Sequence, residues 1–220
     1  MKKLIAIIAL LALLCTLTGC REQESPIMGI PNPEVTIHLS NGSSMRFELF
    51  VQEAPNTVAN FVDLANSGFY DGLEFFRVMP GVLIQAGCPN NDGTGNAGWT
   101  IRGEFSENGV KNDISHTRGV LSMARISGKD GRNTASSQFF IMQGNYPEYD
   151  GEYAAFGAVM DGESLSVLDS IANRAVDVNN VPMVRQKIAT IRVNTHGWEF
   201  EPVTVAIPKE EPTDAPEKKE

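Results

Sequence analysis

The 220-residue sequence has few cysteines, no excess of basic residues and no long apolar run. Its formal net charge of -9 at pH 7 leaves no basic stripe for a phosphate backbone, so we expect no binding to nucleic acid. The longest uninterrupted apolar run, residues 4–14, has eleven residues, whereas a membrane-spanning helix needs about 20. With 42% hydrophobic residues, the sequence predicts one globular domain with a real core and appendages.

The N-terminus has the features of an export signal. Lys2 and Lys3 precede the apolar run, and the sequence LTGC then ends at Cys20, a pattern typical of a cleaved signal. LTGC resembles the lipobox of bacterial lipoproteins, in which the cysteine becomes the first residue and carries the lipid. We therefore expect a lipoprotein signal peptide at 1–19 and an extracytoplasmic protein, anchored to a bacterial membrane through acyl chains such as palmitate on Cys20. The alternative is an ordinary signal peptide with an incidental Cys20.

The cysteine and histidine counts give no sign of a disulfide or a metal site. Cys15 would leave with the signal and Cys20 would be lipidated, so the folded part keeps only Cys88, which cannot form an internal disulfide. A passive thiol is favoured for Cys88 over a nucleophile or metal ligand, because no partner set is visible. The three histidines are scattered in the sequence, so we expect neither a metal nor a cofactor.

Composition divides the mature chain into three parts. Residues 20–33 are polar and rich in proline, which predicts a short flexible tether after the lipidated cysteine. Residues 34–197 carry the periodic apolar pattern of a folded domain. Residues 198–220 are rich in proline and charge, which predicts a disordered tail. We expect the protein to be a monomer.

Apolar periodicity predicts many short strands and two helices. Alternation on both sides of Asn41-Gly42 indicates a hairpin over 35–49, and an amphipathic stripe from Pro55 to Gly68 indicates a helix. Further strands are predicted at 73–79, 82–86, 119–124, 137–142, 154–159 and 186–194, with a second helix at 163–173. This mainly β pattern favours a closed antiparallel barrel whose open ends are covered by the helices.

Two motifs suggest functions that the sequence does not otherwise support. GTGNAG, residues 93–98, matches a dinucleotide fingerprint, but no helix start or βαβ unit frames it, so a flexible loop is the better interpretation. His116 with Asp113 and Ser122 invites a hydrolase hypothesis. A hydrogen-bonded structural histidine is the preferred reading, because triads depend on geometry rather than sequence proximity.

A third constellation combines apolar side chains with a guanidinium and a carboxamide. Strand alternation places Gln138 and Phe140 on one face, and likewise Phe75 and Arg77. One face of each strand belongs to the core, so the other can form an exposed apolar patch with polar groups. Such a surface suits an uncharged polar ligand that carries a compact apolar group.

Four segments, FFRVMPGVLIQAG, HTRGVLSMAR, SSQFFIM and YDGEYAAFG, resemble the cyclophilin family of peptidyl-prolyl cis-trans isomerases in order and spacing. The similarity covers residues 34–195. It implies an eight-stranded antiparallel barrel capped by two helices, and an enzyme without a cofactor that acts on X-Pro bonds of proline-containing polypeptides. In an exported protein, the expected function is to accelerate the folding of other exported proteins.

The resemblance also implies roles for individual residues. Arg77 matches the catalytic guanidinium, and Gln85 and Gln138 match glutamines that orient the substrate backbone. The other implied substrate-binding positions lie along the walls of the proline pocket and along the strand edge that pairs with the peptide: Phe76, Val82, Leu83, Ala124, Arg125, Phe140, Tyr149 and Tyr153.

Some positions depart from the family pattern. Val82 stands where a phenylalanine commonly lines the proline pocket, which predicts weaker substrate contact. Arg125 and Tyr153 stand where asparagine and histidine are common, and Glu148 stands near a tryptophan found in members sensitive to cyclosporin, so we expect weak inhibition by that drug. Because of Val82, a peptide-binding chaperone or scaffold with weak or vestigial isomerase activity remains the alternative function.

Overall fold

The computed structural model describes residues 30–207. The predicted signal peptide, Cys20 and most of the tether lie outside the described residues. Within residues 30–207, no helix is long and apolar enough to cross a membrane. The account below concerns the compact unit that begins at Asn32.

An antiparallel sheet of eight strands forms the main body of this unit, in the order β3-β4-β7-β6-β8-β2-β1-β9. The predicted hairpin, the five short strands and the last strand are all confirmed, although most strands are shorter than predicted. The strands of this sheet are β1 (Glu34–Leu39), β2 (Ser44–Leu49), β3 (Arg77–Met79), β4 (Leu83–Ala86), β6 (Val120–Met123), β7 (Phe139–Met142), β8 (Ala155–Val159) and β9 (Ile188–Asn194).

The sheet is an open half-barrel, so the prediction of a closed barrel is wrong. Strands β3 and β9 remain at opposite edges, and an isolated bridge between Glu74 and Lys187 joins the segments that precede them. The backbone N–H of Val78, in the centre of β3, donates instead to the carbonyl of Asn180, at 2.8 Å. The barrel does not close because the loop before β9 pairs with the free edge of β3, the edge with which β9 would need to pair.

Helix α2 (Pro55–Asn66) begins at the predicted proline. Its first free N–H groups are satisfied by a carboxylate from a distant loop, since Asn56 N and Thr57 N donate to Glu104 at 3.1 and 2.7 Å. The negative charge of Glu104 also suits the positive end of the helix dipole. Helix α2 is thereby fixed to the loop that follows β5 (Trp99–Thr100).

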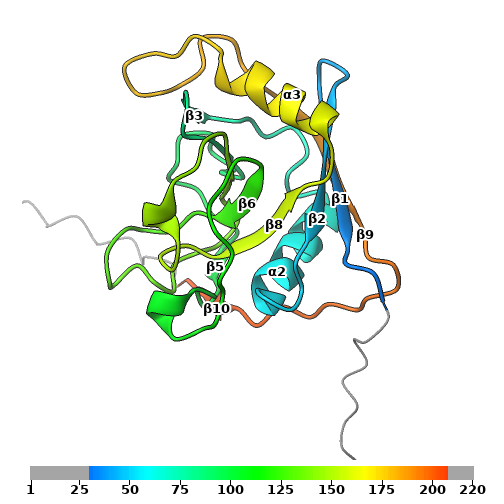
Figure 1. The fold of residues 1–220 in the computed structure, drawn as a ribbon, viewed down its shortest axis with the longest axis vertical. Helices are drawn as coiled ribbons and strands as arrows, with labels where there is room; N and C mark the ends of the chain where they lie inside the picture. Colours follow the sequence, from blue (N-terminus) through cyan, green and yellow to red (C-terminus); the bar gives the residue numbers. More distant parts are fainter. Residues whose placement is uncertain (1–29, 208–220) are drawn as a thin grey trace, which may run out of the picture. The chain divides into compact units, whose positions relative to one another are not determined.

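Helix α3 (Gly162–Ala172) also begins and ends within one residue of the prediction. The Asp161 side chain caps it by accepting a hydrogen bond from Ser164 N at 2.7 Å. Figure 1 shows α3 beside β2, whereas α2 contacts β9.

The core lies between the inner face of the sheet and α2. Phe61 of α2 has its ring 5.4 Å from Tyr70, 5.5 Å from Phe139 and 5.2 Å from Phe156, measured between ring centres. Burial raises the pKa of the Tyr70 hydroxyl, which donates a hydrogen bond to Ser137 O. Because Phe139 points into this core, the next residue along β7 faces outward.

The predicted disordered tail, 198–220, is ordered in its first part. Trp198 and Phe200 stack at 6.0 Å between ring centres and pack against the core. Beyond them, β10 (Val205–Ala206) pairs with β5 to form a small second sheet. Charge and proline content suggested disorder here, but two aromatic side chains provide enough apolar contact to hold the segment.

Candidate functional site

The candidate site begins with a row of side chains across four strands. The antiparallel register pairs Arg77 of β3 with Gln85 of β4, Gln85 with Phe140 of β7, and Phe140 with Ser122 of β6. Directly paired residues point to the same face of a sheet. Their neighbours in the same strands are buried in the core, so this row lies on the outer face.

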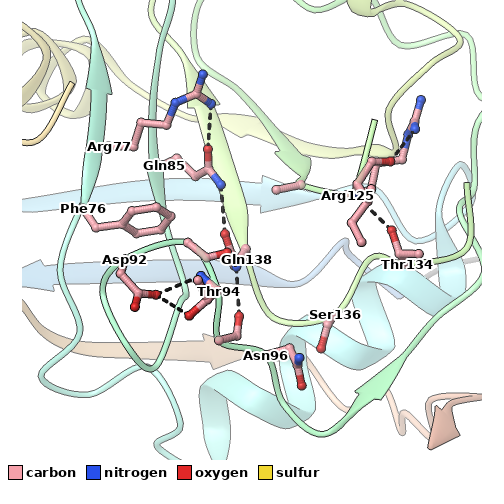
Figure 2. A pocket seen from close by; sticks show the side chains of 14 residues that line it. Phe76, Arg77, Gln85, Asp92, Thr94, Asn96, Arg125, Thr134, Ser136 and Gln138 are labelled. Atoms are coloured by element: carbon pink, nitrogen blue, oxygen red, sulfur yellow. Dashed lines mark hydrogen bonds between the residues drawn. The ribbon is translucent and has the colours of Figure 1, made fainter. Parts of the chain in front are cut away.

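Hydrogen bonds connect the polar members of this row to a neighbouring loop. Arg77 Nη1 donates to Gln85 Oε1 at 3.0 Å, and Gln85 Nε2 donates to Gln138 Oε1 at 3.0 Å (Figure 2). Gln138 Nε2 then donates to the carbonyls of Gly93 and Gly95, both at 2.9 Å. This series of hydrogen bonds fixes the orientation of the Gln85 and Gln138 side-chain amides.

The charge of Arg77 is not neutralised within the part of the chain that the structure describes. No carboxylate there forms an ion pair with Arg77, and Gln85 is the one hydrogen-bond acceptor found for its guanidinium. The side chain is only partly buried, so water can solvate the charge. The remaining N–H groups are therefore available to a ligand on the outer face.

A cavity of about 510 Å³ lies beside this hydrogen-bonded chain. The loop 92–96 forms one side of it, and Ile126, Thr134 and Ser136 contribute to the rest. The sequence-predicted residues that line it are Phe76, Arg77, Gln85, Ala124, Arg125 and Gln138. The structure thus brings six predicted positions together.

The other predicted residues belong to a second apolar cluster, referred to below as the hollow, which adjoins this cavity through Ala124. Leu83 and Phe140 are buried there, and Val82, Tyr149 and Tyr153 are partly buried against them. The Phe140 ring lies 5.5 Å from Tyr153 and 6.0 Å from Tyr149, between ring centres. Ala124 contacts this cluster and also lines the cavity, so the two parts adjoin at the end of β6.

The prediction that Phe75 and Arg77 share a face is wrong. Phe75 is 1% exposed and belongs to the core, whereas Arg77 lies on the outer face. Regular strand structure begins only at Arg77. Residues before it do not follow strand alternation, and Phe76, rather than Phe75, reaches the cavity.

Sequence reasoning missed Asp150, a partly exposed carboxylate that completes a hydrogen-bond network with the buried His116 and Ser122 beside Phe140. His116 Nδ1 lies 3.0 Å from Asp150 Oδ1, and its Nε2 lies 3.0 Å from Ser122 Oγ. Burial lowers the pKa of His116, although Asp150 opposes this effect. A neutral His116 ring donates a hydrogen bond from Nδ1 to Asp150 and accepts one at Nε2 from the Ser122 hydroxyl. The His116 ring also stacks on Phe140, with 6.1 Å between ring centres.

The preferred interpretation of His116 as a structural histidine is confirmed. Its carboxylate partner is Asp150 and not Asp113, and Ser122 is 0% exposed. A buried hydroxyl cannot attack an ester or amide substrate, which argues against the hydrolase hypothesis. The pairing of His116 with Ser122 could be suspected from HTRGVLS, but Asp150 lies 34 residues away from His116 in sequence.

The GTGNAG segment, residues 93–98, is a loop held by side chains that directly precede it in the sequence. Asp92 Oδ1 accepts hydrogen bonds from Thr94 N and Thr94 Oγ1, at 2.8 and 2.7 Å. The buried thiol of Cys88 accepts from Gly95 N at 3.2 Å. A short strand follows instead of a helix, so the segment lacks the helix N-terminus of a dinucleotide site. Among residues 30–207, no three metal-binding side chains cluster.

Comparisons with known proteins agree on one family. The family model described as "Cyclophilin type peptidyl-prolyl cis-trans isomerase/CLD" matches residues 34–193. A peptidyl-prolyl cis-trans isomerase of Synechococcus elongatus is 48% identical over 130 residues, covering 59% of this chain and 83% of that protein. Peptidyl-prolyl cis-trans isomerase B of Bacillus subtilis is 46% identical over 124 residues, covering 56% and 81%.

A solved structure shows the same fold. The crystal structure of a cyclophilin type peptidyl-prolyl cis-trans isomerase from Cryptosporidium parvum has a TM-score of 0.65 and 32% sequence identity. The match covers 74% of this chain and 98% of that chain.

Proposed function

The chain belongs to the cyclophilin-type peptidyl-prolyl cis-trans isomerases and is an enzyme of that type. We propose that it rotates X-Pro bonds at the site made of the cavity lined by Arg77 and Gln85 and the adjoining hollow that contains Phe140, which together we call the groove. The observation that carries this assignment is the position of Arg77. Its guanidinium lacks a carboxylate partner among the described residues and stands in register with the apolar hollow that contains Phe140.

The proposed mechanism is electrostatic. The barrier to rotation about a peptide bond is about 18–20 kcal/mol, because twisting breaks the resonance between nitrogen and carbonyl. A cation beside the amide favours the twisted geometry, in which the nitrogen lone pair is localised. Arg77 would supply this charge from a fixed position, and no covalent bond is made or broken.

Binding and orientation come from the two adjoining parts of the site. The pyrrolidine ring would enter the hollow of Leu83, Phe140 and Tyr149. Gln85 and Gln138 would hold the substrate backbone, since their amides are already oriented by the hydrogen-bonded chain. Preoriented groups of this kind lose little entropy when the substrate binds.

One observation favours a second candidate function, that of a peptide-binding scaffold with weak catalysis. Val82 is only partly buried beside the hollow and contributes less apolar surface than an aromatic ring would. If nothing else fills that space, the lost contact corresponds to about 1–2 kcal/mol.

We further propose that the enzyme is a monomer that acts on exported polypeptides outside the cytoplasm, anchored by lipid at Cys20. The support is the sequence of the first twenty residues, with two lysines, an apolar run and LTGC. Mass spectrometry of the mature protein tests this proposal. An unmodified chain that still begins at Met1 would refute the lipid anchor.

Two-dimensional NMR exchange on a short X-Pro peptide tests the catalytic proposal. At catalytic concentrations the protein should accelerate cis-trans exchange, and titration with the peptide should shift resonances of Gln85, Phe140 and Tyr149. Peptide binding without faster exchange would support the scaffold. Faster exchange with no perturbation at these residues would place the reaction elsewhere.

A further inference from the structure

Arg125 is unusual because it lines the cavity while most of the N–H groups of its guanidinium are engaged elsewhere. The side chain is 4% exposed. Figure 2 shows its guanidinium directed away from Gln85 and Gln138. Nε donates to the Glu152 carbonyl at 2.8 Å, and Nη2 donates to the Glu152 carboxylate at 2.6 Å.

The same guanidinium also holds the chain that follows β6. Nη1 donates to the carbonyls of Ile126 and Gly128, at 2.9 and 3.0 Å. Four of the five N–H groups of an arginine are then used. Arg125 therefore connects residues 126–128, of which Ile126 lines the cavity, to residues 149–153, which carry the two tyrosines of the hollow.

The guanidinium also lies over an aromatic wall of the hollow. Its central carbon is 4.8 Å from the ring centre of Tyr153 and 5.1 Å from that of Phe105, distances typical of cation–π contacts. Tyr153 in turn lies 5.2 Å from Tyr149 and 5.5 Å from Phe140, between ring centres. A shift of Arg125 would therefore displace Tyr153 and, through it, the rings of Tyr149 and Phe140.

The wall needs such support because it is not part of the sheet. Tyr149 ends a short 3₁₀ helix, η2 (Pro147–Tyr149), and Tyr153 lies in the turn before β8. Strand pairing does not fix either side chain. On the other side, the bond between His116 and Asp150 holds the same segment.

We propose that Arg125 is a positioning residue that holds the wall formed by Tyr149 and Tyr153 against Phe140, and so sets the affinity of the hollow for the proline ring. The inference rests on the proposed function of the groove. Arg125 affects substrate binding through Tyr153, whereas Arg77 determines the rate of rotation about the X-Pro bond. Because Glu152 neutralises its charge, Arg125 does not select acidic residues in the substrate.

The test separates affinity from turnover for three arginine variants. NMR titration gives the Kd for an X-Pro peptide, and exchange at saturating peptide gives kcat. Arg125→Met should weaken peptide binding by about 5- to 10-fold while kcat stays within about twofold, because only uniform binding is lost. Arg125→Lys should behave like Arg125→Met, since one ammonium cannot replace the forked set of donors.

Arg192→Met is the matched control. Arg192 also bridges a carboxylate, that of Asp71, and backbone carbonyls, but it lies away from the groove. Its Kd and kcat should equal those of the wild type. An equal effect of Arg192→Met and Arg125→Met would mean that general destabilisation is the cause, and would overturn the proposal.

A double variant tests the route through Tyr153. If Arg125 acts by holding this ring, Arg125→Met should add nothing to the weaker binding of Tyr153→Leu, whereas additive effects would overturn the proposal.

Should Arg125→Met fail to fold, Glu152→Gln removes one partner only and should weaken binding by about two- to threefold. A Kd unchanged in Glu152→Gln and Arg125→Lys would also refute the role. These readouts measure affinity, so they remain valid even if the wild type binds the peptide without accelerating exchange, which would refute the catalytic proposal alone.

Discussion

Replacing Arg77 by alanine should remove most of the catalysis while leaving the fold intact. An acceleration of about 10⁵ corresponds to roughly 7 kcal/mol of transition-state stabilisation. Removing one oriented donor from a preorganised site typically costs about 2.7–4 kcal/mol. Because the Arg77 side chain is only partly buried, water can replace part of its effect, and we expect the lower end of this range, about a 100-fold fall in kcat.

The structure also predicts what Arg77→Ala should leave unchanged. Gln85 Oε1 loses its donor, but Gln85 is partly exposed, so water can take that place and the free energy of unfolding should change by less than about 1 kcal/mol. Peptide affinity should change by no more than about threefold, because the hollow is untouched. Arg77→Lys keeps the charge without the planar fork and should be intermediate.

The assay is NMR exchange at saturating peptide, with urea unfolding and peptide titration on the same samples. Arg46→Ala is the control, because Arg46 is an exposed arginine that pairs with Glu34 on β1. A kcat for Arg77→Ala within threefold of the wild-type value would refute the electrostatic mechanism. So would a loss of activity that matches a loss of folded protein, since the arginine would then be structural.

Three further predictions concern affinity, pH and backbone geometry. Val82→Phe should tighten peptide binding by about 5- to 20-fold in a titration, because it adds apolar surface to the hollow; unchanged affinity would show that the space is already filled. Burial lowers the pKa of His116 in the folded state, so the unfolded chain binds more protons, and stability in urea should fall as pH drops below about 6.5. A flat profile for the wild type would contradict a buried neutral ring. A Cβ at Gly87 (φ +87°) would overlap the backbone carbonyl oxygen of Ser137, whereas a Cβ at Gly109 (φ +74°) would meet nothing within 4 Å. Gly87→Ala should therefore lower the free energy of unfolding by roughly 3 kcal/mol and Gly109→Ala by about 1 kcal/mol.

Local patterns predicted the elements of the fold well. Pro55 and the apolar stripe after it located α2, and alternation on both sides of Asn41-Gly42 located the first hairpin. Closure of the sheet could not be predicted in this way. It depends on whether β9 or the loop carbonyl of Asn180 pairs with the edge of β3, a competition between segments about 100 residues apart in sequence.

The sequence predicted the relative positions of site residues that lie on the same strand. It did not predict the positions of residues on different strands, which depend on how the strands pair. Alternation placed Gln138 and Phe140 on one face, but only the pairing of β3, β4 and β7 places Arg77 beside them. The same local rule failed for Phe75, because regular strand structure had not yet begun. Asp150 was missed because nothing in its neighbourhood in the sequence indicates a contact with His116.

The two parts of the groove are held in place by different interactions. Substitutions in one part should therefore alter substrate affinity, and substitutions in the other should alter the rate. Arg77, Gln85 and Phe140 lie on paired strands, so their spacing is set by backbone hydrogen bonds. The tyrosine wall lies outside the sheet and depends on side-chain contacts, those of Arg125 among them. Changes in the wall should therefore alter substrate affinity with little effect on the position of the charge. Changes at Arg77 should alter the rate with little effect on affinity. If the proposed roles hold, the binding of different polypeptides can be adjusted without altering the row of Arg77, Gln85 and Phe140.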